Sequence, residues 1–425
     1  MRLKRLWQRA FGLTRTVVEG VEFDEDAGEV IVSVRPNAKA KHRCGRCGRR
    51  SPRYDRGEVR CRSGRRRWRA LNLGTVRVYL EADSPRVRCR VHGPTVAQVP
   101  WARHGAGHTR DFDDYAAWLA VHVSKSAVVE MLEVAWRTVG SIVARVSADI
   151  DARVDRLDGL RRIGIDEISY KRGHRFLTVV VDHDSGRLVW AAPGRDKATL
   201  DRFFEELGEP RSAQITHVSA DMADWIANVV RRRIPHAELC ADPFHVVNWA
   251  TKALDIERRR VWNQAATRHY KLANKGAVGD SRQIQHSRWA LWKNPEDLTE
   301  HQQGQLEWIA KTHPRLWRAY CLKEGLRYVF TVKGEEGKEA LDRWISWARR
   351  SRLPAFVQLQ RRIIKFRVAI DAALKSGLSN GLVESTNTKI RLLTRIAFGF
   401  HGPAPLIALA MLSLGGHCPS LPGRD

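Results

Sequence analysis

The stretch Ile163-Gly-Ile-Asp166-Glu-Ile168 constrains the fold more than any other part of the chain. It is a short apolar run that contains acids, and a second run, rich in β-branched residues, follows at 175–182. Two such runs joined by a turn predict a β-hairpin within a sheet. An aspartate in a buried strand is unfavourable unless its charge is compensated, and a bound divalent cation is a common compensation. We therefore expect a sheet that presents Asp166 to a metal ion.

The sheet is expected to continue beyond this hairpin. The sequence predicts strands at 163–168, 176–182 and 188–192, a helix at 198–207, a strand at 215–221, a helix at 225–234 and a last strand that ends at Asp242. This order, β-β-β-α-β-α-β, puts Asp166 and Asp221 at the ends of the first and fourth strands. In a mixed sheet we expect these two strands to be neighbours, so that both acids reach one edge, where ligands usually bind.

Long helices are expected from residue 246 to about 375. This region has few strand signals and holds eight of the 15 tryptophans. We expect most of them to pack helix against helix, and a minority to stack on an unpaired base. A final helix begins after Asn380 and Gly381 and carries Glu384. It also carries side chains suited to phosphate contacts, which are Asn387, Lys389, Arg391 and Arg395.

The N-terminal region predicts a small β-rich zinc-binding domain. Its first 40 residues alternate as strands do, and Cys44-x2-Cys47 lies beside glycines that let backbone amides turn toward the thiolates. A second pair, Cys89-x2-His92, follows after 41 residues, and strands at 68–71 and 75–80 are expected to bring the two pairs together. We predict a structural Cys3His zinc site; the alternative is two free thiols and a surface histidine. The remaining cysteines lack such spacing and are expected to be ordinary thiols: Cys61, Cys240, Cys321 and Cys418.

A helical pattern begins at residue 109. Apolar residues at three- and four-residue steps predict a helix at 109–123, and two short helices with a tight connection follow at 126–135 and 136–145. A pair of helices alone is a weak signal, but beside a zinc module in a basic chain it predicts a DNA-binding helix-turn-helix. The second short helix carries the side chains that we expect to contact DNA, which are Arg137, Thr138, Ser141 and Arg145.

The charge balance indicates a polyanionic partner. The chain has 74 Lys and Arg against 47 Asp and Glu, a net charge of +27 that is spread along the sequence. Such an excess favours nucleic acid, and the alternative is a basic bias of the genome. Seven cysteines, an odd number without an export signal, favour a reducing cytoplasm. The most apolar stretch, 405–414, is shorter than the roughly 20 residues that span a bilayer, so we expect no membrane partner.

Taken together, these motifs resemble those of bacterial insertion-sequence transposases of the DDE type, in the ISL-three family. The resemblance covers roughly residues 15 to 415. It rests on the two metal-binding pairs, His92-Gly-Pro with Val99-Pro-Trp101-Ala, Gly164-Ile-Asp166-Glu, Asp242-Pro-Phe-His245-Val, Ser379-Asn-Gly-Leu-Val-Glu384-Ser-Thr-Asn387-Thr-Lys-Ile, and Arg395-Ile-Ala-Phe-Gly399-Phe. Two positions depart from the family pattern, because Ser385 stands where glycine is expected and Cys89-x2-His92 replaces a second cysteine pair. Neither departure removes a metal-binding group from the expected catalytic set.

The resemblance implies a multidomain α/β protein with an RNase H-like mixed sheet (β-β-β-α-β-α-β-α) that an all-α insertion interrupts. It implies a catalytic triad of Asp166, Asp221 and Glu384 that holds two Mg²⁺ or Mn²⁺ ions for DNA strand cleavage and strand transfer. The zinc finger and the helix-turn-helix would read the terminal inverted repeats. The expected domains are the zinc finger (1–104), the helix-turn-helix (105–155), the first catalytic part (156–250), the helical insertion (251–375) and the second catalytic part with the glutamate (376–425).

The sequence allows alternatives for the second acid and for the function. Asp242 is an alternative to Asp221 as the second acid, and His245 is expected to orient phosphate or a neighbouring group rather than to bind metal. The chain is alternatively a DNA-binding regulator with an inactive transposase-like domain, or a structure-specific nuclease on the same fold. A homodimer or larger assembly on DNA is expected, because two element ends must be held together with target DNA.

Overall fold

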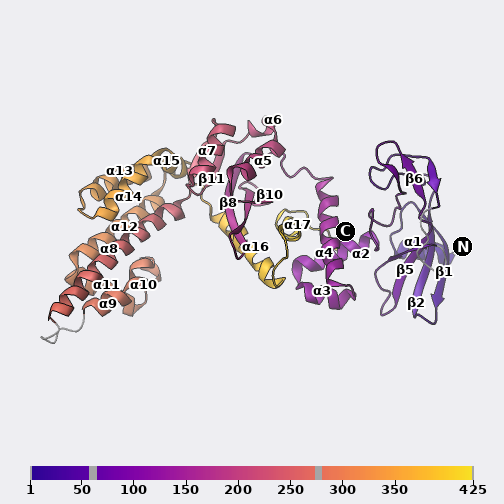
Figure 1. Ribbon diagram of the computed structural model, residues 1–425, viewed down its shortest axis with the longest axis horizontal. Coiled ribbons are helices and arrows are strands. Elements are labelled where there is room, and N and C mark those ends of the chain that lie inside the picture. The colour runs from indigo at the N-terminus through magenta and orange to yellow at the C-terminus, as the bar shows by residue number, and fades with distance from the viewer. Residues whose placement is uncertain (1, 57–64, 273–279, 424–425) are drawn as a thin grey trace. The chain divides into compact units, whose positions relative to one another are not determined.

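The computed structural model describes residues 2–56, 65–272 and 280–423, which form two compact units (Figure 1). Unit 1 comprises Met1–Asp155 and Leu392–Asp425, and unit 2 comprises Arg156–Arg391. Cys61 lies outside the described residues. Within the described ranges, no helix is both long and apolar enough to cross a membrane.

The N-terminal part of unit 1 contains a short helix and two small sheets. The helix is α1 (Arg2–Ala10). The larger sheet has the order β1-β2-β5-β4, with β1 (Thr16–Asp24), β2 (Glu29–Pro36), β5 (Arg77–Ala82) and β4 (Arg66–Arg69). The smaller sheet has the order β3-β6-β7, with β3 (Arg53–Asp55), β6 (Arg86–Cys89) and β7 (Gly93–Val96). Alternate residues such as Val32 and Leu80 point into one core with Trp68 and Trp101, so the predicted β-rich domain is confirmed.

Helix α1 corrects the expectation of strands throughout the first 40 residues. Its Trp7 ring stacks on the ring of Phe11, with 5.5 Å between their centroids. Both rings pack against the core of the four-stranded sheet. Because the two residues are four positions apart, the last turn of α1 brings their rings into contact, whereas a strand would hold them roughly 13 Å apart along one face.

The second part of unit 1 is helical and contains α2 (Arg110–His122), α3 (Lys125–Leu132), α4 (Trp136–Asp151) and α17 (Pro403–Leu414). The hydroxyl of Thr109 caps α2 by accepting a hydrogen bond from the amide of Phe112, and that of Ser124 caps α3 in the same way. Helix α3, a tight turn and α4 form the predicted helix-turn-helix. Helix α17 packs against α4.

Unit 2 contains a five-stranded mixed sheet in the order β10-β9-β8-β11-β12. Its strands are β8 (Arg162–Lys171), β9 (Arg175–Asp182), β10 (Leu188–Pro193), β11 (His217–Ala220) and β12 (Glu238–Ala241). The pairs β8–β9 and β9–β10 are antiparallel, whereas β8–β11 and β11–β12 are parallel. The first and fourth strands are therefore neighbours, as the sequence predicts, and the sheet has the RNase H-like arrangement.

The position of Asp166 differs in detail from the prediction. Strand β8 does not end at this acid but continues, paired with β9, to Lys171. The parallel pairing with β11 does stop just before it, at the pair Ile165 and Ala220. Asp166 therefore lies where the sheet opens on one side of β8, and the neighbouring strand has already ended.

The two faces of this sheet are covered by different helices. Helices α5 (Lys197–Leu207) and α7 (Asp224–Arg233) cover the face that carries Ile163 and Ile165, and α6 (Glu209–Ser212) lies between them in sequence. Helix α16 (Gly381–Ile396) begins on the other face. There a Cβ atom at Gly164 would lie 2.4 Å from a methyl group of Val383, so the close approach of α16 to β8 requires glycine.

The helical insertion extends from the sheet edge and confirms the predicted all-α region (Figure 1). The tryptophans mostly pack, as expected; Trp249 and Trp344 are buried, whereas Trp289 is 60% exposed. The elements are α8 (Pro243–Leu272), α9 (Asp280–His286), α10 (Arg288–Trp292), the 3-10 turn η2 (Pro295–Asp297), α11 (Glu300–Thr312), α12 (Pro314–Val332), α13 (Gly334–Arg350), α14 (Pro354–Lys365) and α15 (Arg367–Ser376).

Candidate active site and zinc centre

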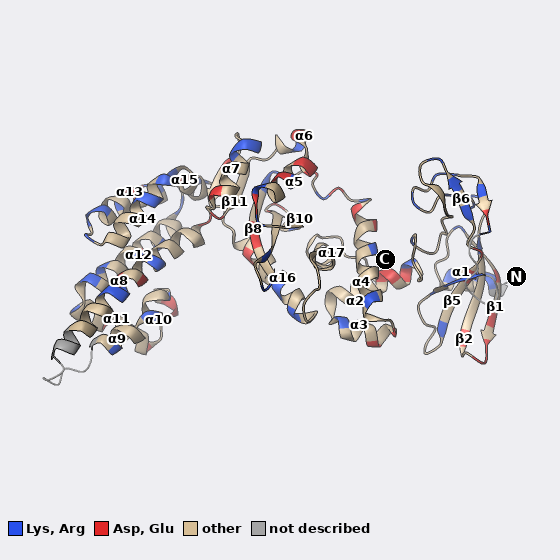
Figure 2. Cartoon of the chain, viewed as in Figure 1, with Lys and Arg blue, Asp and Glu red and all other residues tan. Residues whose placement is uncertain are grey.

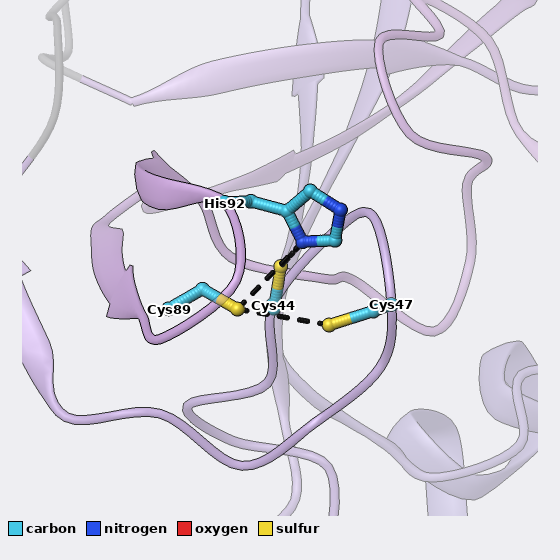
Figure 3. A group of neighbouring side chains, drawn as sticks. All are labelled: Cys44, Cys47, Cys89 and His92. Atoms are coloured by element: carbon cyan, nitrogen blue, oxygen red, sulfur yellow. Dashed lines mark hydrogen bonds between the residues drawn. The ribbon is translucent and has the colours of Figure 1, made fainter.

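Four side chains of unit 1 converge as a metal-binding set (Figure 3). The imidazole Nδ1 of His92 lies 3.7 Å from the sulfur of Cys44 and 3.7 Å from that of Cys89. The sulfurs of Cys47 and Cys89 are also 3.7 Å apart. A tetrahedral zinc ion with bonds of about 2.3 Å requires ligand atoms about 3.8 Å apart, so these residues fit zinc. Pairing of β3 with β6 brings the two halves together across the 41 intervening residues.

The electrostatics of this set also suit a metal. The backbone amides of Val91 and His92 lower the pKa of the Cys89 thiol to about 6. For Cys47 the amide of Arg49 acts to lower the pKa, but burial and the neighbouring thiols raise it. A thiolate is the form that binds zinc, and a bound cation would stabilise the remaining thiolates in turn.

At the open edge of the unit 2 sheet lie the acids predicted from the sequence. Asp166 is on β8, Asp221 directly follows β11, Asp242 directly follows β12, and Glu384 is in the first turn of α16. The carboxylates repel one another electrostatically, and the charges of Asp221 and Asp242 both act to raise the pKa of Asp166. The site is thus assembled from four elements that are far apart in the sequence.

Asp166 is held by hydrogen bonds to both of its carboxylate oxygens. Its Oδ1 accepts from the amide of Glu167 at 2.8 Å, and its Oδ2 accepts from the side-chain amide of Asn387 at 2.8 Å. Burial raises the pKa of Asp166 above its ordinary value, and the hydrogen bond from the Glu167 amide only partly offsets this effect. The side chain of Glu167 itself pairs with Arg195.

Asp242 and His245 form a hydrogen-bonded pair beside Asp221. The buried carboxylate of Asp242 accepts from His245 Nδ1 at 2.7 Å and from the backbone amides of Asn380 at 3.2 Å and Phe244 at 3.4 Å. The other imidazole nitrogen, Nε2, lies 3.7 Å from a carboxylate oxygen of Asp221. The hydrogen bond to Asp242 raises the pKa of His245, and Asp221 adds to this effect.

Glu384 faces the same edge. Burial raises the pKa of its carboxyl, and Asp242 raises it further. One ligand atom each from Asp242, His245 and Glu384 lie within 4.8 Å of one another. Crowded carboxylates with raised pKa values are stabilised in their charged form by a cation, so the donor set fits a divalent metal with oxygen ligands.

One asparagine of the last motif, Asn380, is more buried than its place beside a glycine suggests. Asn380, expected only to precede the final helix, is fully buried. It accepts a hydrogen bond from Ser219 on β11, and its side-chain amide lies 3.5 Å from the carbonyl of Ile165 on β8. Ser219 in turn is 2.7 Å from Nε2 of His183. Asn380 thus ties the start of α16 to both central strands, a role whose only signal in the sequence is an Asn-Gly pair before a helix.

The residues expected to contact DNA differ in their surroundings. Arg137 and Ser141 are exposed on α4, and Thr138 is half-buried. Arg145 instead donates to the buried carboxylate of Asp113 on α2, through Nε at 2.9 Å and Nη2 at 3.0 Å. On α16, the side chains Lys389, Arg391 and Arg395 are exposed, and Asn387 is buried.

Comparisons with known proteins match successive parts of the chain to transposase families. Residues 163–409 match a family described as a transposase, residues 97–147 match the helix-turn-helix domain of transposase family ISL3, and residues 40–92 match the zinc-finger of transposase IS204/IS1001/IS1096/IS1165. The chain is 64% identical to the transposase for insertion sequence element IS1557 of Mycobacterium tuberculosis, in strains CDC 1551 / Oshkosh and ATCC 25618 / H37Rv, and the match covers 100% of this chain and 98% of the relative. It is 28% identical to the transposase for insertion sequence element IS1001 of Bordetella parapertussis, over 90% of this chain and 91% of the relative.

Proposed function

The chain belongs to the ISL3 family of transposases, and on this premise we propose that it cleaves DNA at the terminal inverted repeats of its own insertion sequence and transfers the ends to target DNA. The observation that carries the proposal is the open edge of the unit 2 sheet, where acids from β8, from the end of β11 and from α16 lie close enough to influence one another. We infer that the reaction takes place in the cytoplasm, on nucleoid DNA.

We propose that Asp166, Asp221 and Glu384 hold two divalent cations, Mg²⁺ or Mn²⁺. When bound, such ions activate the attacking water or 3′-hydroxyl and stabilise the leaving oxygen. The protein's own contribution is to fix the carboxylates. Asn387 restrains one oxygen of Asp166 through its side-chain amide, and Asn380 joins the start of α16 to β8 and β11.

We favour Asp221 over Asp242 as the second acid. Proximity alone groups Asp242 with His245 and Glu384, which favours Asp242. Hydrogen bonding favours Asp221, because Asp242 is 1% exposed and already accepts from an imidazole and two backbone amides. The Asp221 side chain is 35% exposed. We give hydrogen bonding more weight, since Asp242 already uses three of its roughly four lone-pair sites, one of them to orient His245 toward Asp221.

We propose that the zinc module and α4 bind the terminal inverted repeats, with Arg137, Thr138 and Ser141 as contacts on α4. Lys389, Arg391 and Arg395 on α16 would contact phosphates, which makes binding sensitive to salt. We also propose that a homodimer or larger assembly holds both ends. The five modules 1–104, 105–155, 156–250, 251–375 and 376–425 remain our division by function, although α8 runs through residue 250 and the compact units divide at Arg391.

The test uses purified protein, Mg²⁺ and labelled duplex DNA that carries an element end. We expect specific nicking at the end in the wild type, and binding without nicking in Asp166→Asn and Glu384→Gln. End binding without cleavage by the wild type, with Mg²⁺ or Mn²⁺, would favour a DNA-binding regulator. Cleavage that depends on DNA structure and not on the end sequence would favour a nuclease.

A further inference from the structure

The turn that follows α16 exposes a large aromatic side chain. Phe398 belongs to the motif Arg395-Ile-Ala-Phe-Gly399-Phe, which the proposed catalytic and DNA-reading roles do not explain. It is 85% exposed, among the most exposed of the large hydrophobic side chains in the described residues. An aromatic ring in this position loses the benefit of burial, so folding alone does not explain its place.

The backbone at this turn is also unusual. Phe398 has φ +53 and the next residue, Gly399, has φ +94. The left-handed region at the end of a helix is usually occupied by glycine or asparagine, so a bulky side chain there is uncommon. The turn is nevertheless closed by hydrogen bonds, from the Phe398 amide to the Arg395 carbonyl at 3.0 Å and from the Gly399 amide to the Thr394 carbonyl at 2.8 Å. The ring is therefore presented on a well-formed turn.

The charged residues near Phe398 in the sequence indicate which kind of partner its ring contacts. Between Glu384 and Asp425 the sequence contains no Asp or Glu, but it contains Lys389, Arg391 and Arg395 before the turn and His401 after it. Figure 2 accordingly shows Lys and Arg on α16 and no acid on α17. An acid-free basic stretch complements a polyanion. Phe398 thus lies in an acid-free part of the sequence, three residues after the exposed Arg395, a group that attracts DNA phosphates.

The turn is fixed to the DNA-reading helices of the same unit. Side chains on either side of Phe398, including Ala397 and Phe400, line an apolar pocket together with Val139 and Val143 of α4. Helix α17, which follows the turn, packs against α4 as well. Phe398 therefore belongs to the same compact unit as the helix-turn-helix, so DNA bound by that unit is its expected partner.

We propose that Phe398 is a DNA wedge, whose ring stacks on a base at an opened step of the DNA bound by unit 1. The inference rests on the proposed function, since it needs the helix-turn-helix to bind DNA. Aromatic and other apolar side chains do stack on bases and open base steps in this manner, and stacking is tolerant of sequence because every base has a flat face. Arg395 would hold the adjacent phosphate.

The test compares three substitutions in the full-length protein. Phe398→Asn removes the ring but keeps a residue that tolerates the left-handed region, and Phe398→Tyr keeps the ring. Phe23→Asn is the matched control, because Phe23 is also an exposed aromatic residue of unit 1, 56% exposed, but lies beside the acidic run Asp24-Glu-Asp26. Affinity for a duplex with one element end is measured by fluorescence anisotropy over a salt series, and base opening by 2-aminopurine placed at successive positions.

We expect Phe398→Asn to weaken binding by about 5- to 150-fold, the range for the loss of one stacked base. The salt dependence should not change, because the ring is uncharged, and a 2-aminopurine signal seen with the wild type should disappear. Phe398→Tyr should keep both the affinity and the 2-aminopurine signal of the wild type, and Phe23→Asn should match the wild type as well.

Two results would overturn the inference. In the first, the wild type binds the ends, and Phe398→Asn binds them with the same affinity and the same 2-aminopurine fluorescence. This result would leave the proposed function intact. The second is a change of oligomeric state in Phe398→Asn without DNA, with an unchanged 2-aminopurine signal, which would assign the ring to a second copy of the chain. A wild-type protein that binds no element end would refute the proposed function itself, and the wedge with it.

Discussion

Replacing Arg145 with methionine tests whether this residue stabilises the helix-turn-helix or contacts DNA. Its partner, Asp113, has a fully buried side chain and accepts two of its hydrogen bonds from the Arg145 guanidinium. Removing one partner of a buried ion pair costs about 3–5 kcal/mol, because the other charge stays buried. Arg103 remains 3.7 Å from Asp113, so we expect a value near the lower end, about 3 kcal/mol.

The effect should appear as faster hydrogen exchange in α2 and α4 of the full-length protein. A loss of about 3 kcal/mol corresponds to roughly 150-fold faster exchange for amides that exchange through opening of these helices. Removing both charges, with Asp113→Leu and Arg145→Met together, should restore much of the protection, since a buried ion pair can often be replaced by apolar residues. Unchanged protection in Arg145→Met, with a salt slope of DNA binding reduced by about one, would refute the structural role and assign Arg145 to a phosphate.

Four further predictions concern other parts of the chain. Native protein should contain about one zinc ion per chain by elemental analysis; Cys44→Ser should lose it, whereas Cys240→Ser, the control, should keep it. Gly325→Ala should destabilise the insertion by about 1–3 kcal/mol in urea unfolding followed by tryptophan fluorescence, because its Cβ would lie 2.9 Å from a tryptophan ring. Gly304→Ala should stabilise it by about 0.5–1 kcal/mol, since in the described part of the chain no atom other than those of its two neighbours and its own helix backbone lies within 4 Å of that Cβ. Burial lowers the pKa of His108, so as the pH falls the unfolded chain takes up the proton before the folded one. The stability of α2, measured by hydrogen exchange, should therefore be complete above about pH 6.5 and decline below it. His108→Phe should remove that decline.

The sheet and its first acid could be predicted because the pattern is local. β-branched runs separated by turns identify the strands, and the helical pattern identifies α4 and the insertion. The first helix could not be identified from the sequence. Its Trp7 and Phe11 rings stabilise it by packing on the core of the four-stranded sheet, and that core forms only in the folded domain. The sequence also predicts too early an end for β8. The parallel pairing stops before Asp166 because β11 ends there, and β8 itself continues.

The candidate site was predictable in its residue types and not in its hydrogen bonds. Spacing alone could not separate Asp221 from Asp242, because both follow a strand of the same sheet. The difference between them lies in burial and in partners from distant segments, such as the Asn380 amide, which reaches Asp242 from 138 positions away. The same holds for Arg145, whose buried partner lies on another helix.

The central claim is that Asp166, Asp221 and Glu384 carry the metal-dependent cleavage of DNA ends, with Asp242 as the support of His245. The most direct measurement is single-turnover cleavage of an end-labelled duplex with Mg²⁺ by Asp221→Asn and by Asp242→Asn, at protein concentrations that saturate end binding. We expect Asp221→Asn to bind the end but to give no detectable product, and Asp242→Asn still to cleave at a reduced rate. Normal cleavage by Asp221→Asn, together with none by Asp242→Asn, would contradict this claim.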